Sequence, residues 1–198
     1  MAKKFIAILV IIFALATTLS ARNLLSVGMN GTYDSTSSSF GIGPYLEYNV
    51  LAKLDVLDVG IGSRIDITFS LPARYWTVHA LIGPSLRIEI GDMWDFSTLL
   101  GMTCALFSPV DSNERGVVSI GGGLAAGFDI YFTQARNMGL YIGGFFSLGV
   151  EPSTMRFPII YTGGSIGFAF KFDTPSRGRG GYHDRGRYSD WDTYGRWY

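Results

Sequence analysis

His79 and Ser85 are the residues in this sequence that come nearest to a catalytic pair, because a histidine base can activate a serine nucleophile for hydrolysis or acyl transfer. Both fall on the same side of one extended segment. Six residues of strand separate them by about 20 Å, too far for proton transfer. Ser63 and Ser119 could approach His79 only through a strand register that the sequence does not define. We therefore expect a hydrogen-bonded structural histidine and no enzyme activity.

Cofactor and redox chemistry have little support in the composition. Cys104 is the only cysteine, so an intramolecular disulfide is excluded, and no metal-ligand spacing occurs. We expect no metal site and no cofactor. The chain carries 16 basic and 16 acidic residues, and Lys3 and Lys4 lie in a segment that we expect to be removed. The remaining chain is slightly acidic, which argues against nucleic acid as a partner.

Alternation of apolar and polar residues runs through most of the chain and predicts strands. The pattern predicts eight of them, each long enough to cross a bilayer when tilted, and neither a βαβ rhythm nor an amphipathic helix accompanies them. The sequence also holds 26 glycines and 15% aromatic residues, a composition typical of β-barrels. The predicted strands cover residues 25–33, 40–50, 57–69, 76–90, 96–107, 118–132, 139–150 and 159–172.

The polar face of these strands combines glycines with charges of both signs. Small residues suit the crowded interior of a narrow barrel, and a mixed set of charges suits an interior network of ion pairs better than a solvated surface. Aromatic residues gather at the strand ends on the other face, as in a membrane girdle. We therefore expect the apolar face to point outward into lipid, in preference to a secreted soluble barrel or sandwich. The predicted interior charges are Glu47, Asp58, Arg64, Asp66, Arg87, Glu89, Asp129 and Lys171.

The segment from Ser165 to Phe172 places Ile166, Phe168, Phe170 and Phe172 on one side and small or polar residues on the other. It resembles the last-strand signal of outer-membrane β-barrels, which ends in a phenylalanine that the assembly machinery reads. The pattern from Leu24 to Phe172 is similar to the small eight-stranded barrels of the OmpX, OmpW and OmpA transmembrane-domain type. The resemblance implies a bacterial outer-membrane protein whose partners are the lipid bilayer and the outer-membrane assembly machinery.

Both ends of the chain differ from this pattern. Lys3 and Lys4, an apolar run over 5–16 and small residues thereafter predict a signal peptide over 1–21, cleaved after Ala16 or Ala21. Residues 22–172 then form the barrel. Residues 173–198 are rich in Gly, Arg, Asp and Tyr and predict a disordered periplasmic tail. Its arginine–glycine segments resemble RNA-binding tracts, but for an exported chain we favour a solvated extension, with a spacer that touches peptidoglycan or an assembly factor as the alternative.

The sequence thus predicts an all-β protein: an eight-stranded antiparallel transmembrane β-barrel with a structural or surface-interaction role. Tyr45, Tyr131, Tyr141 and Phe145 fall on the inner face and should fill the space that the glycines leave. The alternative function is a narrow channel for small or apolar solutes, as the OmpW-type resemblance implies. A lipid-modifying enzyme is less favoured. We further expect arginine at Leu124 to be costly and serine at the inward-facing Gly123 to be mild.

Overall fold

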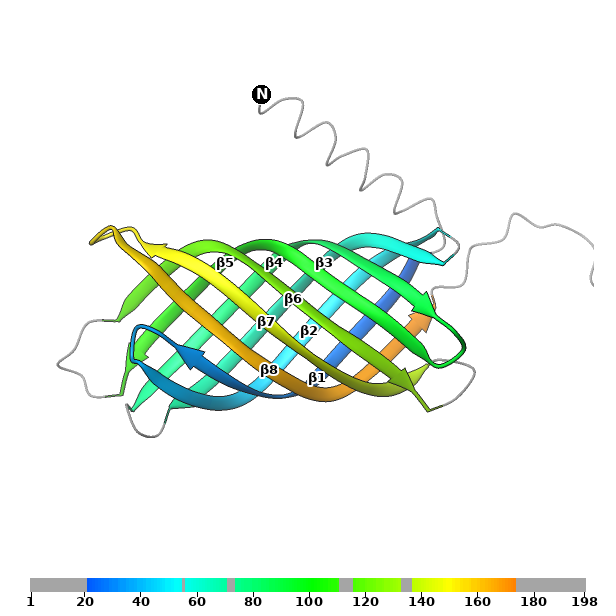
Figure 1. The fold of residues 1–198 in the computed structure, drawn as a ribbon, viewed down its shortest axis with the longest axis horizontal. Coiled ribbons are helices and arrows are strands. Elements are labelled where there is room, and N and C mark those ends of the chain that lie inside the picture. Colours follow the sequence, from blue (N-terminus) through cyan, green and yellow to red (C-terminus); the bar gives the residue numbers. More distant parts are fainter. Residues whose placement is uncertain (1–20, 55, 71–73, 111–115, 133–136, 174–198) are drawn as a thin grey trace, which may run out of the picture.

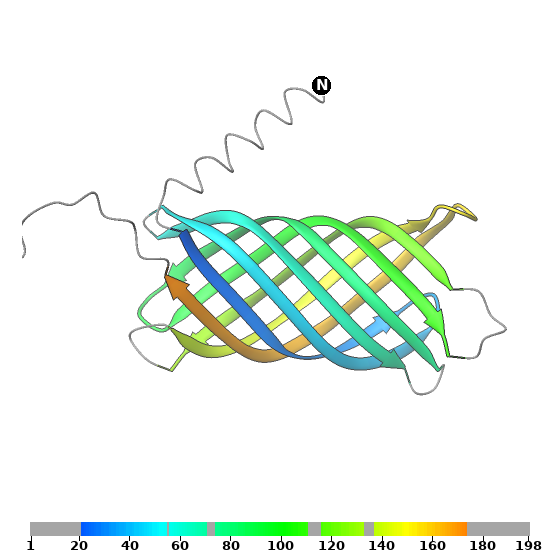
Figure 2. The same cartoon turned by 180° about the vertical axis from the view of Figure 1, so that it is seen from behind.

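The protein is a single closed barrel of eight antiparallel strands in chain order (Figures 1 and 2). The computed structural model describes residues 21–54, 56–70, 74–110, 116–132 and 137–173. The predicted fold class and strand count are confirmed. The strands are β1 (Ala21–Asp34), β2 (Ser39–Leu54), β3 (Leu57–Ser70), β4 (Tyr75–Ile90), β5 (Trp94–Pro109), β6 (Val117–Tyr131), β7 (Met138–Glu151) and β8 (Arg156–Asp173).

The predicted signal peptide and tail fall almost entirely on residues 1–20 and 174–198, which lie outside the described residues. The first described residue, Ala21, begins β1, and the last, Asp173, ends β8. Among the described residues, no helix is long and apolar enough to cross a membrane.

The first and last strands close the barrel. β1 pairs with β8 from Arg22↔Asp173 to Asp34↔Tyr161, so the predicted final strand lies beside the first. β1 begins and β8 ends at the same rim, which also holds the ends at which β2 leads to β3, β4 to β5 and β6 to β7 (Figure 1). We call this rim the terminal end. The other rim, where β1 leads to β2, β3 to β4, β5 to β6 and β7 to β8, is the loop end.

Residues at the strand ends and within the turns stabilise the turns at both rims. At the loop end, Asp34 Oδ1 accepts hydrogen bonds from the backbone N–H groups of Thr36 at 2.6 Å and Ser37 at 3.0 Å, which fixes the β1–β2 turn. At the terminal end, Gly91 has a φ of 65°, a conformation that favours glycine, at the start of the β4–β5 turn. The β7–β8 hairpin extends beyond its neighbours, because β1 pairs with β8 only up to Tyr161.

The outer wall is apolar, and the predicted orientation of the two faces is confirmed. On β8 the outward residues Ile166, Phe168 and Phe172 are each more than half exposed, whereas Ala169 and Lys171 between them are buried. The same alternation runs through every strand. A soluble barrel would bury this face, so the exposed apolar wall fits a lipid environment.

Aromatic pairs mark both rims of this wall. Each pair joins residues that are direct partners on neighbouring strands, so the rings meet across the strand boundary. Near the loop end the ring centroids of Tyr33 and Phe40 lie 5.2 Å apart and those of Phe69 and Trp76 lie 4.7 Å apart. Near the terminal end Phe96 and Phe128 are 5.1 Å apart. These rings have the position of the interfacial girdles of membrane barrels.

Leu124 gives a direct test of the outward face. It is 44% exposed on β6 and lies in register with Leu100 and Phe146 on the neighbouring strands. Leu124→Arg should cost about 2–4 kcal/mol of unfolding free energy in lipid vesicles, measured by urea titration, if the wall contacts the bilayer midplane. Ile90→Arg, at the rim, is the matched control and should cost about 0–1 kcal/mol. Equal costs would contradict the membrane position of the wall.

Gly123, which we expected to accept serine, does not offer a mild control. A Cβ atom added there would lie 2.7 Å from Cγ2 of Thr103 and 3.0 Å from Cβ of Ser147. The inner face of this narrow barrel is already filled at that level, so the expected tolerance of Gly123→Ser is wrong.

Candidate functional site

All the predicted interior charges point into the barrel. Glu89 is partly exposed at the terminal end, and each of the others is at most 8% exposed. The structure joins all of them except Asp129 into two clusters, one around Arg64 at mid-barrel and one around Arg87 at the terminal end. We call them the Arg64 cluster and the Arg87 cluster.

The Arg64 cluster is built on β2 and β3. Arg64 and Glu47 are direct partners across these strands, and their charged atoms lie 3.4 Å apart. Arg64 Nη2 donates to Asp66 Oδ1 at 2.8 Å and to Ser165 Oγ on β8 at 2.5 Å. The guanidinium carbon also lies 4.5 Å from the ring centroid of Tyr45. Arg64 therefore ties three parts of the barrel wall together across the lumen.

Asp66 receives further donors. Asn30 Nδ2 donates to Asp66 Oδ1 at 2.6 Å, and His79 Nδ1 lies 3.2 Å from Oδ2. Asp66 and His79 are direct partners on β3 and β4. Fully buried carboxylates are costly unless they are paired and hydrogen-bonded, and Asp66 meets both conditions.

The Arg87 cluster gathers the charges at the terminal end. Arg87 donates to Asp95 and, at 2.5 Å, to the hydroxyl of Tyr131. Its Nη1 lies 3.8 Å from Asp58 Oδ2, which Arg22 Nη1 approaches to 3.1 Å. Glu89 in turn accepts from Arg22 and lies 3.6 Å from the ammonium of Lys171. One connected set of ion pairs therefore spans β1, β3, β4, β5 and β8.

Two members of this network, Arg22 and Asp95, were missed by the sequence analysis. Both lie just outside the strand limits read from the sequence, since β1 begins at Ala21 and β5 at Trp94. Asp95 is in phase with the inward residues Ser97 and Leu99, so extending the alternation by one residue would have found it.

His79 has the partners of a structural histidine. Its ring lies between aromatic side chains, 4.7 Å from the ring centroid of Tyr161 and 5.6 Å from that of Phe145. Ser119 lies two strands away, at about 10 Å, because Ala105 pairs with both residues. Ser63 pairs with the outward residue Ile82. None of the candidate serines is therefore placed as a nucleophile next to His79.

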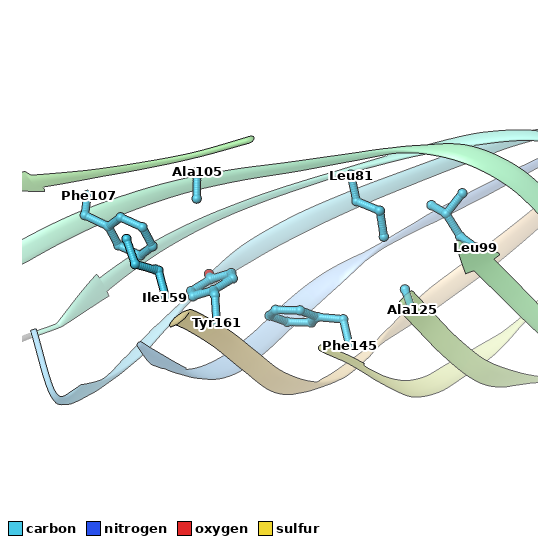
Figure 3. Packing of buried hydrophobic residues seen from close by; sticks show 8 residues of the cluster. All are labelled: Leu81, Leu99, Ala105, Phe107, Ala125, Phe145, Ile159 and Tyr161. Carbon is cyan, nitrogen blue, oxygen red and sulfur yellow. The ribbon is translucent and has the colours of Figure 1, made fainter. Parts of the chain in front are cut away.

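The loop-end half of the lumen holds an apolar cluster beside buried hydroxyl groups such as those of Thr32, Thr68 and Thr77. Its largest side chains are those of Phe107, Phe145 and Tyr161, each at most 5% exposed (Figure 3). We call this group the aromatic cluster. Its members are Leu81, Leu99, Ala105, Phe107, Ala125, Phe145, Ile159 and Tyr161.

Tyrosines fill the space beside the inner glycines, as predicted. A Cβ atom on Gly127 would lie 2.6 Å from Cε2 of Tyr141, and one on Gly167 would lie 2.6 Å from the hydroxyl of Tyr45. The two tyrosine rings meet each other with centroids 5.8 Å apart. Glycine on one strand thus makes room for a ring from another, so the mid-lumen is packed.

Among the residues that the structure describes, no group of three or more His, Cys, Asp or Glu side chains is arranged to hold a metal ion.

A closed antiparallel barrel with an apolar outer wall, aromatic rims and a charged interior is the architecture of a membrane-spanning β-barrel. The chain has the fold of the small eight-stranded outer-membrane barrels. Neisserial surface protein A (NspA) is similar, with a TM-score of 0.52 and 16% identity over 77% of this chain and 97% of that chain.

Two further solved structures are similar. The N-terminal β-barrel domain of Pseudomonas aeruginosa OprF has a TM-score of 0.50 at 12% identity, covering 78% of this chain and 98% of that one. Ail, the attachment invasion locus protein of Yersinia pestis, solved with the heparin analogue sucrose octasulfate, has a TM-score of 0.51 at 13% identity, covering 78% and 100%. No known protein family and no curated protein matches the sequence. At these identities the likeness shows the fold alone.

The Arg64 cluster yields a stability prediction. Arg64→Ala leaves Asp66 and Glu47 buried without their arginine, which should cost about 3–5 kcal/mol of unfolding free energy in urea titrations of the refolded barrel. Arg156→Ala, which removes an exposed arginine from the β7–β8 hairpin, should change it by no more than about 0.5 kcal/mol. A loss at Arg64 as small as that at Arg156 would show that the cluster does not support the fold.

Proposed function

We propose that the protein is a bacterial outer-membrane β-barrel with a structural or surface-interaction role, and that its lumen is a closed plug. The observation that carries this proposal is the filled interior: two ion-paired clusters and an aromatic cluster occupy the lumen in succession. An eight-stranded barrel is only wide enough for side chains to fill. The protein has no catalytic role in this proposal, since His79 lacks a placed nucleophile.

The β7–β8 hairpin supports a surface-interaction role. It projects from the loop end, and its Met155 and Phe157 are 76% and 68% exposed, among the most exposed large apolar side chains of the described residues. Exposed apolar groups on a projecting hairpin are suited to contact with another molecule. In this proposal the loop end faces the outside of the cell and the terminal end faces the periplasm.

The same orientation determines which partners the terminal end of the barrel would contact. The outward Phe168, Phe170 and Phe172 of the closing strand would present the signal that the outer-membrane assembly machinery reads. The signal peptide over 1–21 would direct export, and the segment over 173–198 would extend into the periplasm, where peptidoglycan is its proposed contact. Truncation after Phe172 followed by an assembly assay would show whether the closing strand acts internally or needs the terminal Trp197 and Tyr198.

A narrow channel for small or apolar solutes is the second candidate. The aromatic cluster favours it, because its apolar side chains could pack against an apolar solute. Below that cluster, however, the path crosses Arg64, Arg87 and their carboxylate partners. We therefore rank the closed plug first.

Conductance measurements in planar lipid bilayers distinguish the closed plug from the channel. The refolded wild-type protein should show no steady single-channel conductance, because the paired arginines fill the cross-section. Conductance in the wild type that grows in Arg64→Ala or Arg87→Ala would instead establish the channel. A gel shift between unboiled and boiled samples serves as the control for folding of each variant.

Cysteine labelling in intact cells tests compartment and orientation together. In a Cys104→Ser background, Ser153→Cys at the loop end should react with a membrane-impermeant maleimide in whole cells. Asp92→Cys at the terminal end should react only after the outer membrane is opened. The reverse pattern would contradict the orientation, and a protein that fractionates as soluble would contradict the membrane assignment.

A further inference from the structure

Three carboxylates lie side by side on the inner wall at the terminal end. Glu89 on β4 pairs directly with Asp95 on β5, and Asp95 pairs directly with Asp129 on β6. Directly paired residues on one face of a sheet have Cβ atoms about 4.5–5.5 Å apart, and like charges at that separation repel. This row needs positive charge close to each member.

The nearby basic side chains form ion pairs with the first two carboxylates, Glu89 and Asp95. Glu89 is bound by Arg22 and lies beside Lys171, and Asp95 is bound by Arg87. Asp58 shares Arg22 and Arg87. Among the described residues, the Arg87 cluster with Asp129 thus holds four carboxylates, namely Asp58, Glu89, Asp95 and Asp129, against three basic side chains, namely Arg22, Arg87 and Lys171.

Asp129 is the member without a partner. Its side chain is fully buried, at 0% exposure, and neither carboxylate oxygen has a hydrogen-bond donor. A carboxylate buried in this way is far too costly to persist as an unpaired charge, so it must either be protonated or lie beside a cation. The charged and titratable groups around it are Arg87 on β4, Asp95 on β5, Tyr131 on its own strand, Tyr141 on β7, Lys171 on β8, and Glu47 and Tyr45 on β2.

We propose that Asp129, together with Asp95, binds one small monovalent cation inside the lumen, at its terminal end. The charge count leaves one negative charge that a single positive charge would balance, and the absence of a three-ligand cage among the described residues argues against a multivalent metal ion. Carboxylate oxygens suit a hard cation, so an alkali ion fits the site, and protonation of Asp129 is the competing way to remove its charge. The partly exposed Glu89 marks the terminal end as the side from which the cation enters.

Thermal unfolding of the full-length barrel in detergent tests this site. Sodium, potassium and choline chlorides are compared at equal ionic strength, and a pH series is run in choline. An alkali ion at the site should raise the wild-type Tm by about 2–4 °C in sodium or potassium relative to choline. A wild-type Tm that shows no salt difference but falls in choline as the pH rises would instead show that Asp129 is protonated, and would overturn the proposal. The salt difference should vanish in Asp129→Asn.

Two further variants serve as controls for the Asp129→Asn result. Asp92→Asn removes an exposed turn carboxylate at the same rim and should keep the wild-type dependence. If Asp129→Asn fails to fold, Asp95→Asn breaks the same carboxylate pair and should also lose the dependence. Identical responses of the wild type and Asp129→Asn to both salt and pH would overturn the proposal, because a water bridging Asp129 to Arg87 would then satisfy the carboxylate. Since folding is scored separately by heat modifiability, this result would leave the proposed function untouched.

Discussion

The cost of burying charge in a narrow lumen is the constraint on which this structure depends. Eight strands enclose a space that side chains must fill, so an inward-facing charge has to find its partner within the protein. Arg64 meets this condition by bonding to side chains on β3 and β8 and pairing with Glu47 on β2. The hydrogen bond from Arg64 to Ser165 and the ion pairs of Arg22 and Lys171 connect strands that share no backbone hydrogen bonds, and they hold the cross-section in shape.

The outer wall and the lumen impose opposite demands on the same strands. Lipid requires apolar side chains on the outer face. The small lumen requires inward residues that are either small or large with a hydrogen-bonding or packing partner. Tyr141 and Gly127 show how the second demand is met, because the tyrosine ring occupies the volume that a larger residue at position 127 would need. Such packing leaves an interior better suited to rigidity than to passage, which is why the closed plug is the preferred function.

The sequence was enough to predict the eight strands and the direction of their faces, because the alternation is enforced along the whole length of each strand. Strand ends were harder, since they are set by pairing with neighbours and not by composition. Asp95 and Arg22 were missed for this reason, although each is a partner in the Arg87 cluster. Which charges pair also depends on register and on contacts across the lumen: Arg64 reaches Ser165, far away in sequence, and nothing in the local pattern indicates it. The tight space at Gly123 is likewise a property of its neighbours' side chains.

Pairing of β1 with β8 has a consequence for how the molecule forms. The partners Arg22 and Asp173 lie at opposite ends of the barrel sequence, so the seam joins the first strand to be synthesised with the last. Long-range pairing of this kind is slow, and chains that wait for it expose unpaired strand edges. Lys171 and Ser165, which complete the two charge clusters, arrive only with that final strand. Until then the polar interior has no complete set of partners, so the nascent chain would need protection from aggregation during its transit to the membrane.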